Sequence, residues 1–491
     1  MKKIFSKYPF FLVLLPVFIV IHIEKTYHFL IDYSFIHKEL LITFAAPIVL
    51  YTISLLIYRK KDKAAIFSFI LLFFFYFLGE IKNYLVNKTD FFSSYKFLFS
   101  STFFIAVISY FIIKKKQNLS TVLLYINCLV TLAIIGDITS MLLSNTRQSS
   151  LSKTDITITD CADCQKPDIY YIIFDSYGSS PILKSEFDYD NTSQDSFLIK
   201  NGFQVLRNSH SNYNLTPFCI ASTFSMNYLP NIDTNKQYFA IDYLNTVKKV
   251  HESPLFQLFA NHGYSIVNHS IFDIDNFPTT IPRYDQWRID KLYQQHNIIR
   301  KMYNEAGWNF PPWTRISFGT DPDESYVENR ISHDSTTFDH LSATIKQPLS
   351  NTPKLVYAHI LLPHSPYFFD SSGNRIEPSY TLTPKEDGQG YVEQVIYTNK
   401  LMKKLVDELM QNIKKPTIIV IQGDHGYRFY NHNKKKEEFA NLNAIYLPEQ
   451  YNTAIPDSVS GVNTFRFLIN LIFKEKIPLL DTKSYYLKYS K

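Results

Sequence analysis

Two runs of apolar and β-branched residues each end at a carboxylate. Residues 417–422 are followed by Gly-Asp424-His425-Gly, and residues 167–174 are followed by Asp175. An aspartate beside a histidine offers a carboxylate oxygen and an imidazole nitrogen to one divalent cation. The Asp-His-Gly triplet alone also suits a tight turn in which the aspartate caps a helix. The second strand with a carboxylate at its end favours the metal site.

A threonine stands where a short apolar helix is expected to begin. Thr216 precedes Pro217 and a run of small and apolar residues, and proline is common in the first turn of a helix. In one interpretation the Thr216 side chain only caps this helix. In the other, the hydroxyl and the positive end of the helix face an anionic substrate. A threonine hydroxyl is hardly ionised at neutral pH, so a divalent cation would be needed to stabilise its alkoxide.

Further side chains could bind a phosphate or move a proton. His364 lies in a proline-flanked loop after the apolar run 355–362, and it is the best candidate for the acid that protonates a departing oxygen. Arg428, His432 and His359 are candidate phosphate contacts. His359 lies inside the apolar run itself, where a hydrogen-bonded core histidine is the favoured alternative.

The elements that must position these residues alternate between strand and helix over about three hundred residues, which predicts a mainly parallel sheet between helices. In open α/β sheets ligands bind outside the carboxyl ends of the strands, where Asp175 and Asp424 fall. Besides the two strands above, the sequence predicts strands near residues 203–205, 264–268, 355–362 and 444–447, and helices near residues 253–263, 395–413 and 462–473.

The first 143 residues are dominated by long apolar runs that predict transmembrane helices. Clusters of basic residues at 2–7, 59–63 and 114–116 fall on one side of the membrane if there are five spans, which makes that side and the N-terminus cytoplasmic. Residues 144–166 then form a linker and residues 167–491 an exported catalytic domain. The five predicted spans are 8–23, 40–58, 64–78, 97–113 and 121–143.

The composition bears on whether the chain binds nucleic acid. The net charge of +6 among 491 residues belongs largely to the basic clusters beside the spans, so no nucleic-acid partner is predicted. Cys161 and Cys164 lie in the exported linker, where a local disulfide is plausible. A redox-active pair or half of a zinc site is less favoured, because no second cysteine pair or nearby histidine completes either one. Residues 284–329 fit the strand and helix alternation poorly and contain all three tryptophans. One interpretation is an insertion that faces the substrate or the membrane. The other is an ordinary segment whose aromatic side chains pack against the domain.

Taken together, these motifs resemble the sulfatase-like branch of the alkaline phosphatase superfamily over residues 167–473. Five spans before an exported domain are similar to lipoteichoic acid synthases and phosphoethanolamine transferases. The resemblance implies that Asp175, Thr216, Asp424 and His425 hold one divalent metal ion and that Thr216 is the nucleophile. The mixed carboxylate and imidazole ligands fit Zn or Mn, and they leave Mg or Ca open. The resemblance also implies that His432, within Asn-His-Asn, helps to hold the substrate phosphate.

The sequence departs from these families at two places. Many of the transferases carry glutamate where this chain has Asp175. True sulfatases need Cys-x-Pro-x-Arg or its serine equivalent, and Cys219 lacks that context, which disfavours sulfate ester hydrolysis.

The function expected from the sequence is transfer of a phospho-alcohol group, such as phosphoethanolamine or phosphoglycerol, from a phospholipid donor to a surface glycan or lipid through a phospho-threonine. The enzyme would be a multi-pass protein of the cell (inner) membrane with its catalytic domain on the extracytoplasmic side. Two alternatives stay open. One is a metal-dependent phosphodiesterase or sulfatase-like hydrolase on the same site, and the other is a non-catalytic membrane protein that binds a surface polymer.

Overall fold

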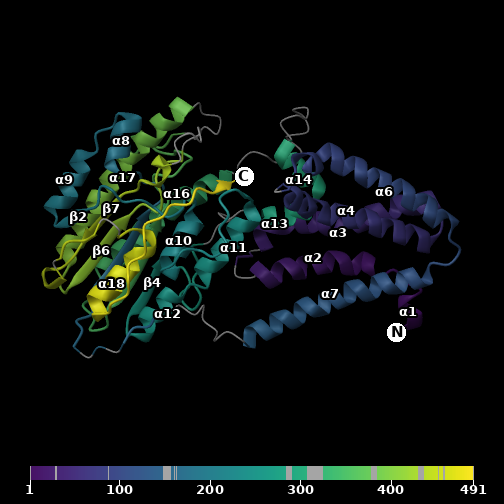
Figure 1. Ribbon diagram of the computed structural model, residues 1–491, viewed down its shortest axis with the longest axis horizontal. Coiled ribbons are helices and arrows are strands. Elements are labelled where there is room, and N and C mark those ends of the chain that lie inside the picture. The colour runs from purple at the N-terminus through teal and green to yellow at the C-terminus, as the bar shows by residue number, and fades with distance from the viewer. Residues whose placement is uncertain are drawn as a thin grey trace.

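A computed structural model of the protein shows an α/β domain beside a bundle of apolar helices (Figure 1). This is the fold class that the sequence predicts. The structure describes residues 2–27, 30–31, 33–86, 88–146, 156–159, 161, 163–282, 290–306, 324–376, 384–428, 436–451, 453–456 and 459–489.

A six-stranded sheet forms the centre of the α/β domain, with the strand order β2-β7-β6-β1-β5-β4. β1 is parallel to β6 on one side and to β5 on the other, and β4 is parallel to β5. β7 runs antiparallel to both β6 and β2, so the predicted mainly parallel sheet contains one reversed strand. The strands are β1 (Asp168–Phe174), β2 (Phe203–Val205), β4 (Ser265–His269), β5 (Lys354–Ile360), β6 (Thr417–Gln422) and β7 (Asn443–Tyr446).

Helices cover both faces of this sheet, which explains the continuous apolar strands. Alternate β1 side chains such as Tyr171 and Ile172 enter separate hydrophobic cores on opposite faces. One core includes α10 (Thr216–Ser225), α12 (Pro254–Asn261) and α18 (Thr464–Phe473). The other includes α8 (Ser180–Phe187), α9 (Thr192–Lys200), α16 (Glu324–Ile345) and α17 (Pro384–Asn412).

The N-terminal bundle contains α2 (Phe11–Tyr27), α3 (Tyr33–Tyr58), α4 (Lys61–Val86), α6 (Tyr95–Lys115) and α7 (Ser120–Thr146). Among the described residues, four stretches are long and apolar enough to cross a membrane: 36–58, 61–86, 95–115 and 120–143. They correspond to the second to fifth predicted spans. The first predicted span forms α2, which is shorter at 17 residues. Large apolar side chains such as Leu56 and Phe103 point outward, as contact with lipid requires.

Three helices lie between the bundle and the α/β domain: α11 (Ala240–His251), α13 (Asp290–Gln295) and α14 (Ile298–Ala306) (Figure 1). Ile298 is buried beside Leu78 and Leu98 of the bundle. The described part of the segment 284–329 therefore contacts the membrane helices, as the membrane-facing alternative expects. The tryptophans of that segment lie outside the described residues.

Several short elements complete the fold. Cys161 and Cys164 form the expected local disulfide. A separate two-stranded sheet joins β3 (Gln237–Tyr238) to β8 (Lys488–Tyr489) near the C-terminal end. The remaining elements are α1 (Lys2–Phe5), α5 (Asp90–Ser93), η2 (Glu437–Phe439), η3 (Glu449–Tyr451) and η4 (Gly461–Asn463).

Candidate active site

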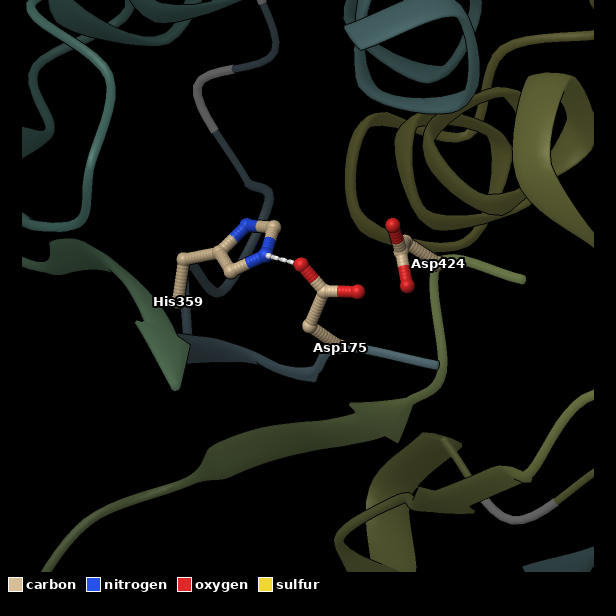
Figure 2. A group of neighbouring side chains, drawn as sticks. All are labelled: Asp175, His359 and Asp424. Carbon is tan, nitrogen blue, oxygen red and sulfur yellow. Dashed lines mark ion pairs between the residues drawn. The ribbon is translucent and has the colours of Figure 1, made fainter. Parts of the chain in front are cut away.

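Three adjacent central strands bring polar side chains together at their carboxyl-terminal ends. Asp175 follows β1, Asp424 follows β6, and His359 lies on β5 opposite Ile173 in the parallel register. One ligand atom from each of the three side chains lies within 4.8 Å of the other two, and all three residues are buried (Figure 2). The carboxyl ends of the central strands therefore form a compact acidic centre, as the sequence predicts.

Asp424 is fixed through one carboxylate oxygen. Its Oδ1 accepts a hydrogen bond from the backbone N–H of Ser176 at 2.9 Å. Its Oδ2 is buried, has no hydrogen-bond partner among the described residues, and lies 3.5 Å from Nε2 of His425. Gly423 allows the close approach behind it, because a Cβ there would lie 2.5 Å from the carbonyl oxygen of Tyr177.

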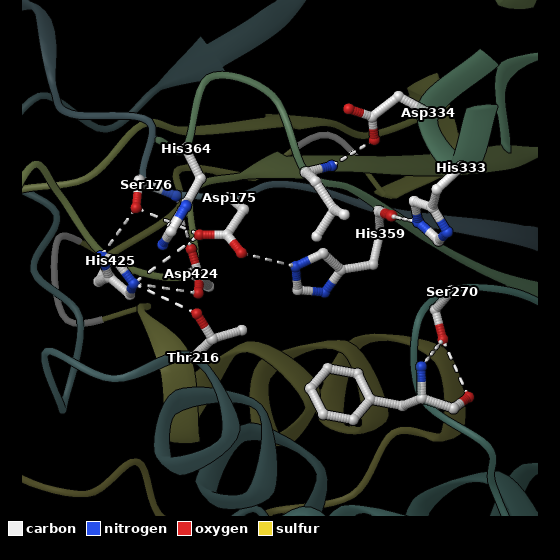
Figure 3. Close-up of polar contacts among 12 residues, drawn as sticks. Asp175, Ser176, Thr216, Ser270, His333, Asp334, His359, His364, Asp424 and His425 are labelled. Atoms are coloured by element: carbon white, nitrogen blue, oxygen red, sulfur yellow. Dashed lines mark hydrogen bonds and ion pairs between the residues drawn. The ribbon is translucent and has the colours of Figure 1, made fainter. Parts of the chain in front are cut away.

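Thr216 faces this centre from the start of α10. Leu215 occupies the N-cap position, so the capping interpretation of Thr216 is not supported. The Thr216 Oγ1 lies 3.3 Å from Nε2 of His425, which is itself 3.8 Å from Oδ1 of Asp175 (Figure 3). The structure thus brings together Asp175, Thr216, Asp424 and His425, the four residues that the sequence placed in one metal site.

The ring of His425 is oriented by its other nitrogen. Nδ1 lies 2.7 Å from the carbonyl oxygen of Gly426, a geometry that places the proton on Nδ1. The lone pair of Nε2 then faces Thr216 and the two carboxylates. Ser176 adds a hydroxyl 3.5 Å from Nδ1, and its Oγ donates to Oδ1 of Asp175 at 3.2 Å.

His359 is directed at the carboxylates rather than into the core. Its Nδ1 pairs with the hydroxyl of Tyr357 at 2.9 Å, and its Nε2 lies 3.6 Å from Oδ2 of Asp175 with no hydrogen-bond partner in the described part of the chain. Burial raises the pKa of Asp175, while the positive charge that His364, His425 and His359 carry when protonated, together with the hydrogen bond from His359, lowers that pKa below its usual value. The Asp175 side chain is therefore a carboxylate at neutral pH.

The residues present fit a divalent cation. Oδ2 of Asp424 and Nε2 of His359 are buried polar atoms that no described residue hydrogen-bonds, and an unpaired buried polar atom is costly. Both are ligand atoms, and both face the carboxylate of Asp175 (Figure 2). A mixed set of carboxylate and imidazole ligands suits Zn or Mn.

His364 lies between two arginines. Its Nε2 contacts the guanidinium of Arg428, and Arg330 lies 3.2 Å from Nδ1 and 3.3 Å from the backbone oxygen. Burial lowers the pKa of His364, and the two guanidiniums lower it further, while Asp175 opposes this change. The imidazole is therefore neutral at neutral pH, with Nδ1 near the carbonyl oxygen of Ser365 and Nε2 facing Arg428 as an acceptor.

Other residues of the site were missed or cannot be placed. Ser176, Arg330 and Asp334 were not singled out, although Ser176 directly follows the first acidic strand end and could have been found there. Arg330 and Asp334 lie on α16, far from the motifs in sequence, and carry no pattern of their own. His432 lies outside the described residues.

The model of the sulfatase family matches residues 167–452 of the chain. No curated protein matches the sequence. Solved structures with a similar arrangement include the zinc complex of the C-terminal periplasmic domain of EcEptC from Escherichia coli, with 12% identity, 68% of this chain and 90% of that chain covered, and a TM-score of 0.42. The integral membrane lipooligosaccharide phosphoethanolamine transferase A from Neisseria meningitidis is 9% identical, with a TM-score of 0.38. The match covers 93% of this chain and 95% of that chain. The phosphonate monoester hydrolase from Silicibacter pomeroyi is 13% identical, with a TM-score of 0.39. The match covers 65% of this chain and 76% of that chain.

Proposed function

The chain belongs to the sulfatase family, and we propose that it transfers a phospho-alcohol group, of phosphoethanolamine or phosphoglycerol type, from a phospholipid to a surface glycan or lipid. The observation that carries this proposal is the Thr216 hydroxyl, which lies 3.3 Å from His425 and faces the carboxylates of Asp175 and Asp424. A hydroxyl nucleophile beside a candidate metal centre suits phosphoryl transfer.

The neighbouring thiol does not compete for this role. Cys219 is buried one turn into α10, and its Sγ donates to the carbonyl oxygen of Tyr213 at 2.9 Å. Burial raises the pKa of this thiol, and Asp424 raises it further, so the thiol stays protonated. We therefore assign the role of nucleophile to Thr216 rather than to this thiol.

Asp175, His359, Asp424 and His425 would hold one divalent cation, Zn or Mn by the ligand types. When bound, the cation supplies positive charge that lowers the pKa of a nearby hydroxyl and offsets the charge of the substrate phosphate. Oγ1 of Thr216 forms a bond to phosphorus as the bond to the lipid alcohol breaks, and the proton of the hydroxyl ends on that alcohol. The phospho-threonine keeps the head-group substituent until an acceptor hydroxyl displaces Thr216.

His364 and Arg428 act together on the substrate in this proposal. A phosphate that binds Arg428 draws its guanidinium away from Nε2 of His364. The neutral imidazole can then take the proton of the acceptor hydroxyl in the second displacement and return it to Thr216. In the first displacement the same imidazole would take the proton of Thr216 and pass it to the departing lipid alcohol, which is the acid role expected from the sequence.

Membrane helices would anchor the site near a phospholipid donor. Four described stretches of the bundle are long and apolar enough to cross a membrane, and an anchored site meets a high local concentration of lipid head groups. The basic clusters beside the spans favour a cytoplasmic N-terminus and an extracytoplasmic catalytic domain in the cell membrane.

The proposal is tested by intact mass spectrometry on the full-length protein. The purified protein is incubated with metal in vesicles of phosphatidylethanolamine or phosphatidylglycerol, beside a Thr216→Ala variant. We expect a metal-dependent adduct confined to the unmutated protein, and its mass identifies the transferred group. Release of the free phospho-alcohol at an undiminished rate without an acceptor would instead identify a hydrolase. Failure to bind metal or to form an adduct with either donor would favour the binding protein.

A further inference from the structure

The C-terminal segment 483–489 runs beside residues 211–215, which lead directly to the nucleophile. Oγ of Ser484 donates to the carbonyl oxygen of Ser211 at 2.7 Å, and the N–H of Tyr485 donates to that of Asn212 at 2.9 Å. Tyr485 also forms a parallel bridge with Tyr213, and their rings are stacked with centroids 5.7 Å apart. The segment therefore pairs with the approach to Thr216 in the manner of a short parallel strand.

Asn214 connects this segment to the nucleophile most directly. Its side chain is buried, and its amide pairs with both backbone groups of one residue: Oδ1 accepts from the N–H of Leu487 at 2.9 Å, and Nδ2 donates to the carbonyl oxygen of Leu487 at 3.3 Å. Nδ2 also lies 3.5 Å from Oε2 of Glu438. A side chain that is satisfied on both its donor and its acceptor side holds one orientation.

The start of α10 depends on the residues that Asn214 holds. Asn214 lies two residues before Thr216, and the intervening Leu215 is the N-cap, whose carbonyl oxygen accepts from Phe218 and Cys219 at 3.0 Å each. The Thr216 side chain projects from the first position of this helix. A shift of the loop therefore moves the nucleophilic oxygen relative to His425, and reaction rates fall steeply with such displacement.

We propose that Asn214 is a positioning residue for Thr216, and that the segment 483–489 forms the other half of this support. The segment lies beyond residue 452, where the match to the sulfatase family ends. A part of the chain outside the matched region thus sets the geometry of the nucleophile. The inference rests on the proposed function, because it takes Thr216 to be the attacking residue.

Turnover of a soluble phosphodiester tests this role in the full-length protein. The probe is bis(p-nitrophenyl) phosphate with added Zn or Mn, and the variants are Asn214→Ala and Asn214→Asp, the second of which keeps the size of the side chain but loses the donor. We expect kcat to fall about tenfold or more in both, with KM within about twofold, because the substrate contacts stay in place. Retained metal and melting temperature are measured on each variant.

Tyr228→Phe is the matched control. The Tyr228 hydroxyl donates to the carbonyl oxygen of Asp481 at 2.6 Å and accepts from the N–H of Lys483 at 2.8 Å, so the change loosens the same segment further from Thr216. We expect kcat of this variant within about twofold of the unmutated enzyme.

Three outcomes distinguish the claims. The positioning role would be overturned if kcat of the Asn214 variants were the same as that of Tyr228→Phe. It would also be overturned if the Asn214 variants raised KM and left kcat unchanged. If Asn214→Ala does not fold, Asn214→Asp decides the question by the same criteria. Turnover in the unmutated protein that does not exceed that of Thr216→Ala would instead refute the nucleophile itself, and with it the positioning role.

Discussion

Asp175 and Asp424 place two carboxylates in one buried centre, where water cannot solvate their charge. Burying an ionised carboxylate is costly unless it is paired or binds a metal. Asp424 receives one backbone hydrogen bond on Oδ1, while Oδ2 is buried and no described residue hydrogen-bonds it. At the scale of single residues, the site is therefore built to be more stable with a cation than without one.

Replacement of Asp424 by asparagine separates these two states. The change Asp424→Asn keeps an acceptor for the N–H of Ser176 and removes the charge. We expect metal affinity to fall at least about tenfold, because the loss of a residue that only supports a metal ligand already costs about 10–100-fold. Because a ligand at a hundred times its Kd adds about 2.7 kcal/mol to folding, a chelator should lower the melting temperature of the unmutated protein and barely change that of the variant.

Metal content after dialysis and melting curves with and without the chelator check this prediction. The apo form of the variant should melt at or above the apo form of the unmutated protein, since a buried charge has been removed. An equal drop in melting temperature for both proteins on chelation would contradict the assignment of Asp424.

At the scale of elements, α16 supports the loop that carries His364. The Asp334 side chain on α16 accepts a hydrogen bond from the N–H of Leu361 at 2.6 Å, just after β5. Arg330, one turn earlier on the helix, contacts His364 itself. A helix without a recognisable motif thus fixes the path of the chain between His359 and His364.

Asp334 makes stability depend on pH. Burial raises its pKa from 3.8 to about 7, while the N–H of Leu361 and Arg330 oppose this rise. The folded state thus binds the proton more tightly than the unfolded state, so the stabilisation is complete below about pH 4 and is lost as the pH rises through about 7. Each unit of pKa difference corresponds to about 1.4 kcal/mol.

The variant Asp334→Asn keeps the acceptor for Leu361 and cannot titrate. We expect the stability of the unmutated protein, relative to this variant, to fall between about pH 5 and pH 7, as measured by thermal or urea unfolding in detergent. A constant difference across that range would show that Asp334 does not titrate there in the folded state.

The strand ends could be predicted from sequence because they join two strong signals: a continuous apolar run and a polar residue directly after it. Asp175 and Asp424 were found in this way, and Thr216 through its proline. The sequence could not show whether His359 is a site residue or a histidine of the core, because it lies within an apolar strand in either case. Nor could the reversed direction of β7 be predicted, since its short apolar run fits either pairing.

At the scale of the whole molecule, the segment before α16 connects the catalytic domain to the membrane helices. Arg300 of α14 forms an ion pair at 2.8 Å with Glu39 of α3, which is buried. Gln294 also donates to Glu39, at 3.3 Å. Gly79 of α4 permits this contact, because a Cβ there would clash with the carbonyl oxygen of Gln295. The segment 290–306 therefore fixes the domain against the bundle.

Loss of this ion pair should uncouple the lipid donor from the site. Arg300→Ala leaves the buried carboxylate of Glu39 without its cation, and breaking a buried pair in this way costs about 3–5 kcal/mol. We expect faster amide exchange over residues 290–306 and a lower rate with phospholipid vesicles. The kcat for bis(p-nitrophenyl) phosphate should stay within about twofold of the unmutated protein, because the site at the carboxyl ends of the central strands is unchanged.

Two further variants sharpen this prediction. Lys346→Ala removes a cation from a surface pair in which Lys346 is exposed and Glu408 half-buried, and it should change neither assay, since surface pairs contribute about 0–1 kcal/mol. Adding Glu39→Gln to Arg300→Ala removes the unpaired charge and should restore slow exchange over residues 290–306. If Arg300→Ala lowered both rates in parallel, the ion pair would stabilise the fold of the catalytic domain, and docking on the membrane helices would not explain its role.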